Sequence, residues 1–443
     1  MDMSQNERQD EKELNAYSPE TRLIYGEMQD PAWDYSHHLL PPMSSSATYR
    51  LDSAQRGAQG FMEFAHHTPE VDVRTKAPIY IYDRLGEPNK DMLEQNLAFA
   101  EGGDVAVTFA SGMAAISGVL GMLTAAGSEI VAHSTLYGCT YSLLTNWYPR
   151  LKIGVRFTDL TNVANLEEAI TDKTRVVYVE SPVNPTMRLV DLKAVADIVR
   201  RVNAARGKDE RIYTVVDSTF ATPFCQRPIS FGFDFVVHSL TKAICGFGTE
   251  VGGVVIGPSW SRDPLLLYRK DFGGSMSSKS AWPILVMGLP SLAVRMRAMQ
   301  ETAGKVAQFL ATRPEIECVH YPGLPAFPQY ALARRQMVDY DGNFAPGSMI
   351  YFVMKGNDPN DSLRRAEACI NRIARDAYCI TLAVSLGNIR TLIEHPGSMT
   401  HSAIPAEEQV ANGMDPGGIR LAIGIEKAED IIRDLKQSLE AGR

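Results

Sequence analysis

Residues 235–257 read F-V-V-H-S-L-T-K-A-I-C-G-F-G-T-E-V-G-G-V-V-I-G, with a β-branched apolar run on each side of a glycine-rich turn. Each run predicts a buried strand, and Lys242 lies just beyond the end of the first. A lysine at this place is costly unless its amine is paired, deprotonated or covalently bound. The hydroxyl groups of Ser239 and Thr241 flank the same point and suit a bound phosphate. The alternative is a surface lysine that follows a strand.

Similar short runs recur on both sides of this segment and alternate with helical stretches. Apolar, β-branched runs predict strands at 105–109, 130–132, 155–158, 176–180, 213–217, 235–238 and 251–256. Apolar residues at helical spacing lie between several of these runs, at 91–100, 111–123 and 192–205. This alternation predicts right-handed crossovers and an α/β fold, in which helices cover both faces of a mostly parallel central sheet.

The composition and the periodicity of the sequence change twice along the chain, which predicts three parts. Residues 1–75 read as an N-terminal arm that contacts a neighbouring subunit, because Pro, Ser and His are mixed there without a sustained period; the alternative is a disordered tail. Residues 76–290 form a large domain, and 291–443 a smaller α/β domain after a long helical stretch at 280–311. The smaller domain contains a predicted loop rich in Pro and Gly at 318–347. Its predicted strands are 349–354, 382–385 and 419–423.

The composition excludes several classes of protein. The chain has 443 residues, of which 45% are hydrophobic and 22% charged, as in a soluble globular protein with a sizeable core. With a net charge of −8, no basic field is present to hold nucleic acid or anionic lipid. Six cysteines without a C-x-x-C pair predict neither a disulfide framework nor a metal site. No secretory signal or bilayer-length apolar run is visible, so we expect a cytoplasmic protein without nucleic-acid or membrane partners.

Two features at other strand ends give Lys242 a chemical context. Asp217 closes the strand in V-V-D-S-T-F, at the carboxyl end where open α/β sheets bind ligands. A carboxylate there would keep the ring nitrogen of pyridoxal 5′-phosphate (PLP) protonated; the alternative is a helix N-cap. In F-A-S-G-M-A-A-I, Gly112 and Met113 begin a helix whose free N–H groups suit a phosphate; the alternative is an ordinary capped turn.

Three further side chains extend this context. Tyr82 and Arg84, in I-Y-I-Y-D-R just after the arm, could add a hydroxyl group and a guanidinium fork to the phosphate. Arg420 lies inside the apolar run G-I-R-L-A-I-G, where its charge needs a partner. A substrate carboxylate is one candidate and an internal Asp or Glu the other. Together these residues favour a PLP site in which Lys242 forms a Schiff base with the cofactor.

These motifs, in this order, resemble those of the Cys/Met-metabolism family of PLP-dependent enzymes, which includes cystathionine γ-synthase, cystathionine γ-lyase and methionine γ-lyase. The matching motifs are Y-D-R at 82–84, S-G-M at 111–113, L-Y-G-C-T at 136–140, E-S-P-V-N-P at 180–185, V-V-D-S-T at 215–219, H-S-L-T-K at 238–242, A-V-S-L-G at 383–387, H-P-G-S-M-T-H at 395–401 and the strand around Arg420. The resemblance implies a type I aminotransferase-like fold and a homotetramer built from two tight dimers.

The resemblance also implies roles for single residues. Lys242 would bind the cofactor, and Asp217 would pair with its ring nitrogen. Tyr137 would stack on the ring and assist the leaving group, and Asn184 would contact the side of the ring oxygen. The remaining cofactor contacts would come from Gly112, Met113, Thr219, Ser239 and Thr241, and, across the dimer interface, from Tyr82 and Arg84 of the neighbouring subunit.

Within the family, two positions favour an enzyme of the methionine γ-lyase type. Cys139, in L-Y-G-C-T, stands where methionine γ-lyases characteristically have cysteine, although the alternative is a small buried residue. Val384 stands where cystathionine γ-lyases carry a glutamate. Arg420 and Ser385 would hold the substrate's carboxylate. We therefore expect elimination of a heteroatom leaving group from Cγ of an L-amino acid, which gives a 2-oxo acid and ammonia.

Three departures from the family pattern leave the leaving group open, and one of them is the long N-terminal arm at 1–74, which has little in common with the arms of the family. C-G-F-G-T-E at 245–250 replaces the usual S-G-H-x-D, and D-S-T at 217–219 replaces D-N-T. One alternative is a γ-lyase for another γ-substituted amino acid such as canavanine, whose guanidinium-oxy group would be attracted by Glu250 or Asp83. Another is γ-replacement of the O-acetylhomoserine sulfhydrylase or cystathionine γ-synthase type. A non-catalytic relative is disfavoured because the lysine, aspartate, tyrosine and arginine are present together.

Overall fold

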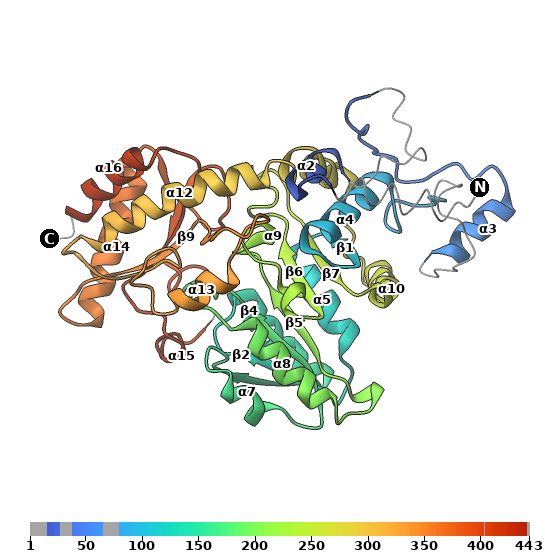
Figure 1. Cartoon of the computed structure of the whole chain (residues 1–443), viewed down its shortest axis with the longest axis horizontal. Coiled ribbons are helices and arrows are strands. Elements are labelled where there is room, and N and C mark those ends of the chain that lie inside the picture. The colour runs from blue at the N-terminus through green and yellow to red at the C-terminus, as the bar shows by residue number, and fades with distance from the viewer. Residues whose placement is uncertain (1–15, 27–37, 65–78, 403, 441–443) are drawn as a thin grey trace.

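A computed structural model describes residues 16–26, 38–64, 79–402 and 404–440. In this part of the chain the strands form two sheets, one of seven strands and one of five. The long helix α12 (Leu292–Ala311) runs from the larger sheet to the smaller one, as Figure 1 shows. The smaller sheet lies with α14 (Pro359–Asp376) and α16 (Ala428–Leu439) at the C-terminal side of the molecule.

The large sheet has the strand order β1-β7-β6-β5-β4-β2-β3. Strand β7 is antiparallel to both of its neighbours, β1 and β6, whereas the remaining neighbours pair in parallel. The mostly parallel sheet is therefore confirmed. Its strands are β1 (Val105–Phe109), β2 (Glu129–His133), β3 (Gly154–Thr158), β4 (Thr174–Glu180), β5 (Tyr213–Asp217), β6 (Phe235–Ser239) and β7 (Gly253–Gly257).

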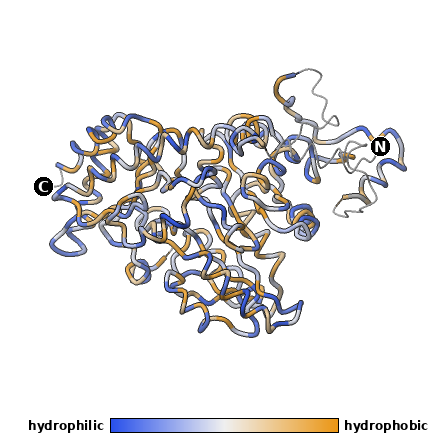
Figure 2. The backbone as a smooth tube through the Cα atoms, viewed as in Figure 1, coloured by the Kyte–Doolittle hydropathy of each residue, from blue (hydrophilic) through white to orange (hydrophobic). Residues whose placement is uncertain are grey.

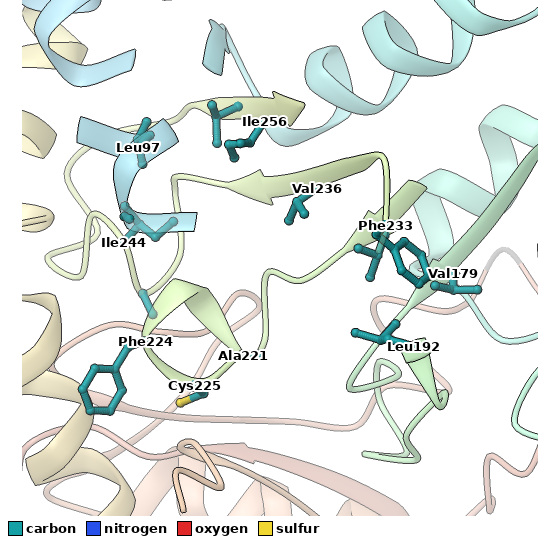
Figure 3. Close-up of a cluster of buried hydrophobic side chains, with 14 of the residues drawn as sticks. Leu97, Val179, Leu192, Ala221, Phe224, Cys225, Phe233, Val236, Ile244 and Ile256 are labelled. Atoms are coloured by element: carbon teal, nitrogen blue, oxygen red, sulfur yellow. The ribbon is translucent and has the colours of Figure 1, made fainter. Parts of the chain in front are cut away.

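Helices cover both faces of this sheet, as predicted. The helices of this region are α4 (Pro88–Glu101), α5 (Gly112–Leu123), α6 (Gly138–Ser142), α7 (Ala164–Ala169), α8 (Leu192–Asn203), α9 (Thr222–Cys225), α10 (Arg262–Phe272) and α11 (Ser278–Pro283). Successive residues of β6 point to opposite faces: Val236 joins the core that contains Leu97 of α4, and Val237 joins the core that contains Ile116 of α5. Figure 3 shows the first of these cores, with Leu97, Val236 and Ile256.

The small sheet has the strand order β10-β11-β12-β9-β8 and a core of its own. Its strands are β8 (Ile316–His320), β9 (Met349–Met354), β10 (Ile380–Leu382), β11 (Thr391–Glu394) and β12 (Gly418–Ala422). Helix α12 contributes to both cores, since Leu292 and Met296 pack in the large-sheet core and Val306 and Leu310 in the small-sheet core. One rigid helix thus links the two sheets.

Three local expectations differ from the structure. The predicted helix over 280–311 is interrupted: α11 ends at Pro283, one π-helical turn spans Ile284–Gly288, and α12 begins only at Leu292. Proline is the physical reason, because Pro283 and Pro290 cannot donate helical hydrogen bonds. The predicted loop at 318–347 contains the end of β8 and α13 (Tyr330–Gln336). The strand expected at 382–385 ends at Leu382.

The described parts of the predicted arm contain α2 (Pro19–Tyr25) and α3 (Ala54–Glu63). Helix α2 is held to α12 by an ion pair between Glu20 and Arg297. The segment before α3 is tied to the large domain, because Ser44 donates its N–H to the Asn89 side chain at 2.7 Å. The rest of the predicted arm lies outside the described residues. A contact of the arm with another subunit stays a prediction.

Hydrophobic and hydrophilic residues alternate along the backbone in Figure 2. In the described ranges, none of the helices is both long enough and apolar enough to cross a bilayer. Helix α15 (Ala406–Ala411) lies between β11 and β12 in the chain.

Candidate active site

The candidate site is built at one edge of the large sheet. Strands β4, β5 and β6 are parallel neighbours, so their carboxyl ends meet at this edge. Glu180 ends β4, Asp217 ends β5, and Lys242 follows β6 by three residues. Residues Glu180 and Asp217 are direct register partners. The topology therefore gathers the predicted lysine and aspartate at the ligand-binding edge of an open α/β sheet.

Lys242 reaches from this edge toward the small-sheet domain. Its Nζ atom donates a hydrogen bond to the Oγ atom of Ser385 at 2.7 Å. Burial lowers the pKa of Lys242, and the nearby positive charge of Arg420 lowers it further. A lowered pKa increases the fraction of neutral amine, which is the form that attacks an aldehyde.

Asp217 is held at the base of the same site. Its Oδ1 atom accepts the N–H of Thr219 at 3.0 Å, and the Thr219 hydroxyl accepts the N–H of Ser239 at 2.9 Å. Burial raises the pKa of the Asp217 carboxyl, whereas hydrogen bonds from Thr219 and the charge of His238 oppose this shift. A protonated ring nitrogen would provide the positive partner that this buried carboxylate needs.

The N-terminus of α5 lies against the same residues. Ser111 is the N-cap, and its Oγ atom accepts the N–H of Ala114 at 3.1 Å. The N–H groups of Gly112 and Met113 belong to the first turn, where a helix offers donors to an anion. A Cβ atom on Gly112 would lie 2.9 Å from Cβ of Ser239, so only glycine allows this close approach.

Thr241, which was predicted to bind a phosphate, is engaged within the glycine-rich turn. Its Oγ1 atom accepts the N–H of Gly252 at 3.1 Å and donates to the Gly252 carbonyl at 3.3 Å. These two bonds close the loop between β6 and β7. The structure therefore gives Thr241 a role in shaping the turn, and a phosphate contact from its hydroxyl stays a prediction.

Tyr137 and Cys139 lie together above the sheet edge. The Cys139 thiol donates to the Tyr137 hydroxyl at 3.4 Å, and the Tyr137 N–H donates to Oε1 of Glu180 at 2.8 Å. Burial and the contact with Cys139 raise the pKa of Tyr137, so its hydroxyl holds its proton at neutral pH. A cavity of about 410 Å³ opens at Cys139, and Met113 and Trp147 also contribute to its lining.

Arg420 is buried in β12, with 3% of its surface exposed. Its Nη1 atom donates to Oδ1 of Asn184 at 3.0 Å, and its Nη2 atom donates to the Ser385 carbonyl at 2.9 Å. Nη2 also forms an ion pair with Glu394 at 2.9 Å. Of the two partners that the sequence left open, the internal acid is present in the structure. Asn184, Ser385 and Arg420 are brought together.

Several of the predicted residues, among them Tyr82, Arg84 and Val384, form no hydrogen bond or ion pair with Lys242 or Arg420 in the described part of the chain. Arg84 is exposed, donates from Nη1 to the Lys270 carbonyl at 2.7 Å, and lies with its guanidinium carbon 5.6 Å from the ring centre of Tyr82. Val384 is 56% exposed in the single chain. Asp83, one of the two acids considered for a cationic leaving group, pairs with the buried Lys90 at 2.9 Å.

The sequence interpretation missed Glu180 and Glu394. Glu180 carries the same signal as Asp217, because both are carboxylates at the ends of predicted strands. Burial and the charge of Asp217 raise the pKa of Glu180 well above its usual range. Glu394 had no such signal, because it ends a four-residue strand that the sequence did not predict.

The residues present fit PLP. Lys242 supplies a primary amine, Asp217 a buried carboxylate, and the start of α5 an anion site that is closed to any side chain at Gly112. In the described part of the chain, no cluster of three or more His, Cys, Asp or Glu side chains is placed to hold a metal ion.

Comparison with known proteins gives a consistent result. A family model described as "Cys/Met metabolism PLP-dependent enzyme" matches residues 20–440. The L-methionine gamma-lyase of Porphyromonas gingivalis is 38% identical over 422 residues, which cover 95% of this chain and 96% of that protein. A cystathionine beta-lyase of Coxiella burnetii is 37% identical over 362 residues, or 81% of this chain and 87% of that protein.

Solved structures agree in fold. The cystathionine gamma-lyase of Lactobacillus plantarum complexed with L-serine superposes with a TM-score of 0.79 at 28% identity, over 96% of this chain and 99% of that chain. The cystathionine gamma synthase of Xanthomonas oryzae pv. oryzae in complex with cystathionine gives 0.81 at 31% identity, over 96% and 98% of the two chains. The predicted type I fold with a smaller second domain is confirmed.

Proposed function

The chain belongs to the Cys/Met-metabolism family of PLP-dependent enzymes, and within this family we propose that it is a γ-lyase of the methionine type. The proposed reaction removes the thiol from Cγ of L-methionine and gives methanethiol, 2-oxobutyrate and ammonia after one water is consumed. The observation that carries the proposal is the contact between the Cys139 thiol and the Tyr137 hydroxyl, next to a cavity that Cys139, Met113 and Trp147 help to line. The L-methionine gamma-lyases at 36–38% identity support the same choice.

Lys242 would hold the cofactor and move the protons. PLP bound there supplies an electron sink, which acidifies the protons on Cα and then on Cβ of the substrate. Once released from the cofactor by the substrate's amine, the Lys242 amine is the base that takes these protons. Its lowered pKa suits this role, since a base works best when its pKa lies near the working pH. Ser385 keeps the amine positioned through the 2.7 Å hydrogen bond.

Tyr137 would protonate the departing sulfur. Its raised pKa means that the hydroxyl carries its proton at neutral pH, as a general acid requires. The hydrogen bond between its N–H and Glu180 fixes the backbone of the turn that presents the ring. Cys139 contacts the Tyr137 hydroxyl directly and therefore lies where the leaving group would depart.

Arg420 and Ser385 would receive the substrate's carboxylate. Arg420 is oriented by Asn184 and by the Ser385 carbonyl, so the guanidinium is fixed before the substrate arrives. Val384, next to Ser385, offers an apolar side chain and no charge to a second carboxylate. This arrangement favours a substrate with one carboxylate and a neutral tail.

A γ-lyase for a guanidinium-oxy substrate such as canavanine is the second candidate, on the observation that Glu250 is half-buried in the turn after Lys242. The pairing of Asp83 with Lys90 weakens this candidate, because the charge of Asp83 is already compensated. A γ-replacement enzyme would use the same residues and differ in the final acceptor. We further propose a cytoplasmic homotetramer, in which Tyr82 and Arg84 reach the phosphate of the neighbouring subunit.

The test is the release of ammonia and a 2-oxo acid from L-methionine by the purified holoenzyme without an added thiol. Production of both, in equal amounts with methanethiol, supports the proposal. A requirement for an added nucleophile would assign γ-replacement instead. No reaction with L-methionine, but turnover of canavanine, would support the second candidate.

A further inference from the structure

Arg420 carries a resident counter-ion. Arg420 on β12 and Glu394 on the neighbouring strand β11 are register partners. The side chain of Glu394 is 1% exposed and that of Arg420 is 3% exposed. Oε1 of Glu394 lies 2.9 Å from Nη2 of Arg420 and accepts the Thr400 hydroxyl at 2.8 Å. Oε2 of Glu394 is buried and has no hydrogen-bond partner among the described residues. The pair is thus sealed from solvent but incompletely satisfied.

The hydrogen bonds of Arg420 limit what a carboxylate could take from it. A guanidinium has five N–H groups, of which two are on Nη2. Nη2 donates one hydrogen bond to the Ser385 carbonyl and lies 2.9 Å from Oε1 of Glu394, its ion-pair partner. A carboxylate that binds as a two-pronged fork needs two neighbouring donors. A fork that uses Nη2 therefore meets the carboxylate oxygen of Glu394 already 2.9 Å from that nitrogen.

The charges lead to the same conclusion. Arg420 and Glu394 compensate each other in a region from which water is largely excluded. A second carboxylate at Arg420 would place two negative groups against one positive group, and like charges a few ångströms apart repel strongly at low dielectric. Glu394 also acts on Lys242, whose pKa it raises against the effect of Arg420. Its charge is therefore felt across the site.

We propose that Glu394 sets the affinity of the site, because it competes with the substrate's carboxylate for Arg420 and so weakens amino-acid binding. The inference rests on the proposed function, in which Arg420 receives that carboxylate. In the empty site Glu394 compensates the buried guanidinium. With substrate present it lowers affinity, and the same repulsion speeds the release of the 2-oxo acid product, which keeps the carboxylate.

The experiment measures ligand binding without turnover. L-norleucine has no leaving group at Cγ, and n-pentylamine is the same molecule without the carboxylate. Binding of each to the holoenzyme and to its Glu394→Gln variant is followed by the change in cofactor absorbance. We expect Glu394→Gln to bind L-norleucine at least tenfold more tightly and n-pentylamine within twofold of wild type. Glu408→Gln, which removes an exposed carboxylate on α15, should change neither.

Two further variants separate the outcomes. If Arg420→Leu leaves L-norleucine binding unchanged, Arg420 does not hold the carboxylate, and that part of the proposed function fails. If Arg420→Leu weakens L-norleucine alone while Glu394→Gln fails to strengthen it, only the competition by Glu394 is overturned. If Glu394→Gln does not fold, Thr400→Val serves instead. Loss of the Thr400 hydroxyl strengthens the hold of Glu394 on Arg420, so L-norleucine should bind less tightly relative to n-pentylamine; an unchanged ratio overturns the inference.

Discussion

The Nζ atom of Lys242 lies 2.7 Å from the Oγ atom of Ser385, although 143 residues separate them in the chain. Lys242 follows a strand of the large sheet, and Ser385 follows a strand of the small sheet. Ser385 has a φ of +87°, a conformation that non-glycine residues rarely adopt. The strained backbone of Ser385 directs its hydroxyl group toward the Lys242 amine and its carbonyl group toward Arg420. Both sheets are thus needed to form the site.

Lys242→Ala should abolish turnover and leave the fold intact. The variant loses both the amine that binds the cofactor and the base that moves the protons, and each acid/base role contributes at least ~100-fold to the rate. Ammonia release and thermal unfolding are measured together. Turnover above about a hundredth of wild type, in a folded variant, would contradict the role given to Lys242.

Gly112→Ala should weaken cofactor binding about tenfold or more. Its Cβ atom would lie 2.9 Å from Cβ of Ser239 and push the start of α5 away from the sheet. The dissociation constant for PLP is measured by absorbance after resolution to the apoenzyme. Gly304→Ala is the matched control, because a Cβ atom on this helical glycine has no atom within 4 Å. It should leave PLP affinity unchanged and stabilise α12 by up to ~1 kcal/mol.

Arg84 should act on the active site of the neighbouring subunit. It is exposed in the single chain, where its partners are Tyr82 and the Lys270 carbonyl. Mixing Arg84→Ala subunits with Lys242→Ala subunits should restore part of the activity, because one hybrid site in each dimer then contains both native groups. Verified heterodimers without recovery would show that Arg84 serves its own chain.

Substrates with a neutral tail should be preferred to cystathionine, whose tail ends in a second carboxylate. Val384 offers no polar contact to that carboxylate, and Glu250 adds negative charge on the turn after Lys242. Two like charges about 4 Å apart repel by up to ~4 kcal/mol at an effective dielectric near 20. The measurement is kcat/KM for methionine, canavanine and cystathionine, with Glu250→Gln alongside. If cystathionine is the best substrate, the charge argument is refuted. If methionine is preferred and Glu250→Gln has the same kcat/KM values as wild type, only the apolar contribution of Val384 remains.

Stability should fall as the pH drops from about 6.5 to about 4, in part because of His133. Burial lowers the pKa of His133 to about 4, and its Nδ1 atom accepts the N–H of Leu160 at 3.0 Å, which requires the neutral ring. In this pH window the unfolded chain binds a proton that the folded chain does not, so stability is complete above pH 6.5 and is lost toward pH 4. The contribution is at most about 3 kcal/mol.

The matched variant for this prediction is His133→Asn, whose Oδ1 atom can accept the same N–H without titrating. Its free energy of unfolding should depend less on pH between 6.5 and 4 than that of wild type, measured by denaturant unfolding at each pH. His38→Gln, at an exposed position, should retain the wild-type dependence. Equal slopes for His133→Asn and wild type would contradict the assignment.

The sequence by itself determined the large sheet and the edge of that sheet at which Asp217 and Lys242 lie. Its strands are short, β-branched and separated by amphipathic helices, so period and length identify them without tertiary information. Once the strands are parallel, Asp217 and Lys242 must lie at the same edge, because Asp217 ends one strand and Lys242 follows the carboxyl end of its neighbour. The N-terminus of α5, just after β1, was predictable for the same reason.

Only the tertiary structure decided how the small sheet completes the site. Strand β11 has four residues and gives no readable period, so the pairing of Glu394 with Arg420 depends on a register that arises when β11 and β12 pack. The bond between Lys242 and Ser385 likewise depends on α12, which fixes one sheet against the other. A buried ion pair and an inter-domain hydrogen bond are set by packing over long sequence separations, and local sequence patterns do not encode them.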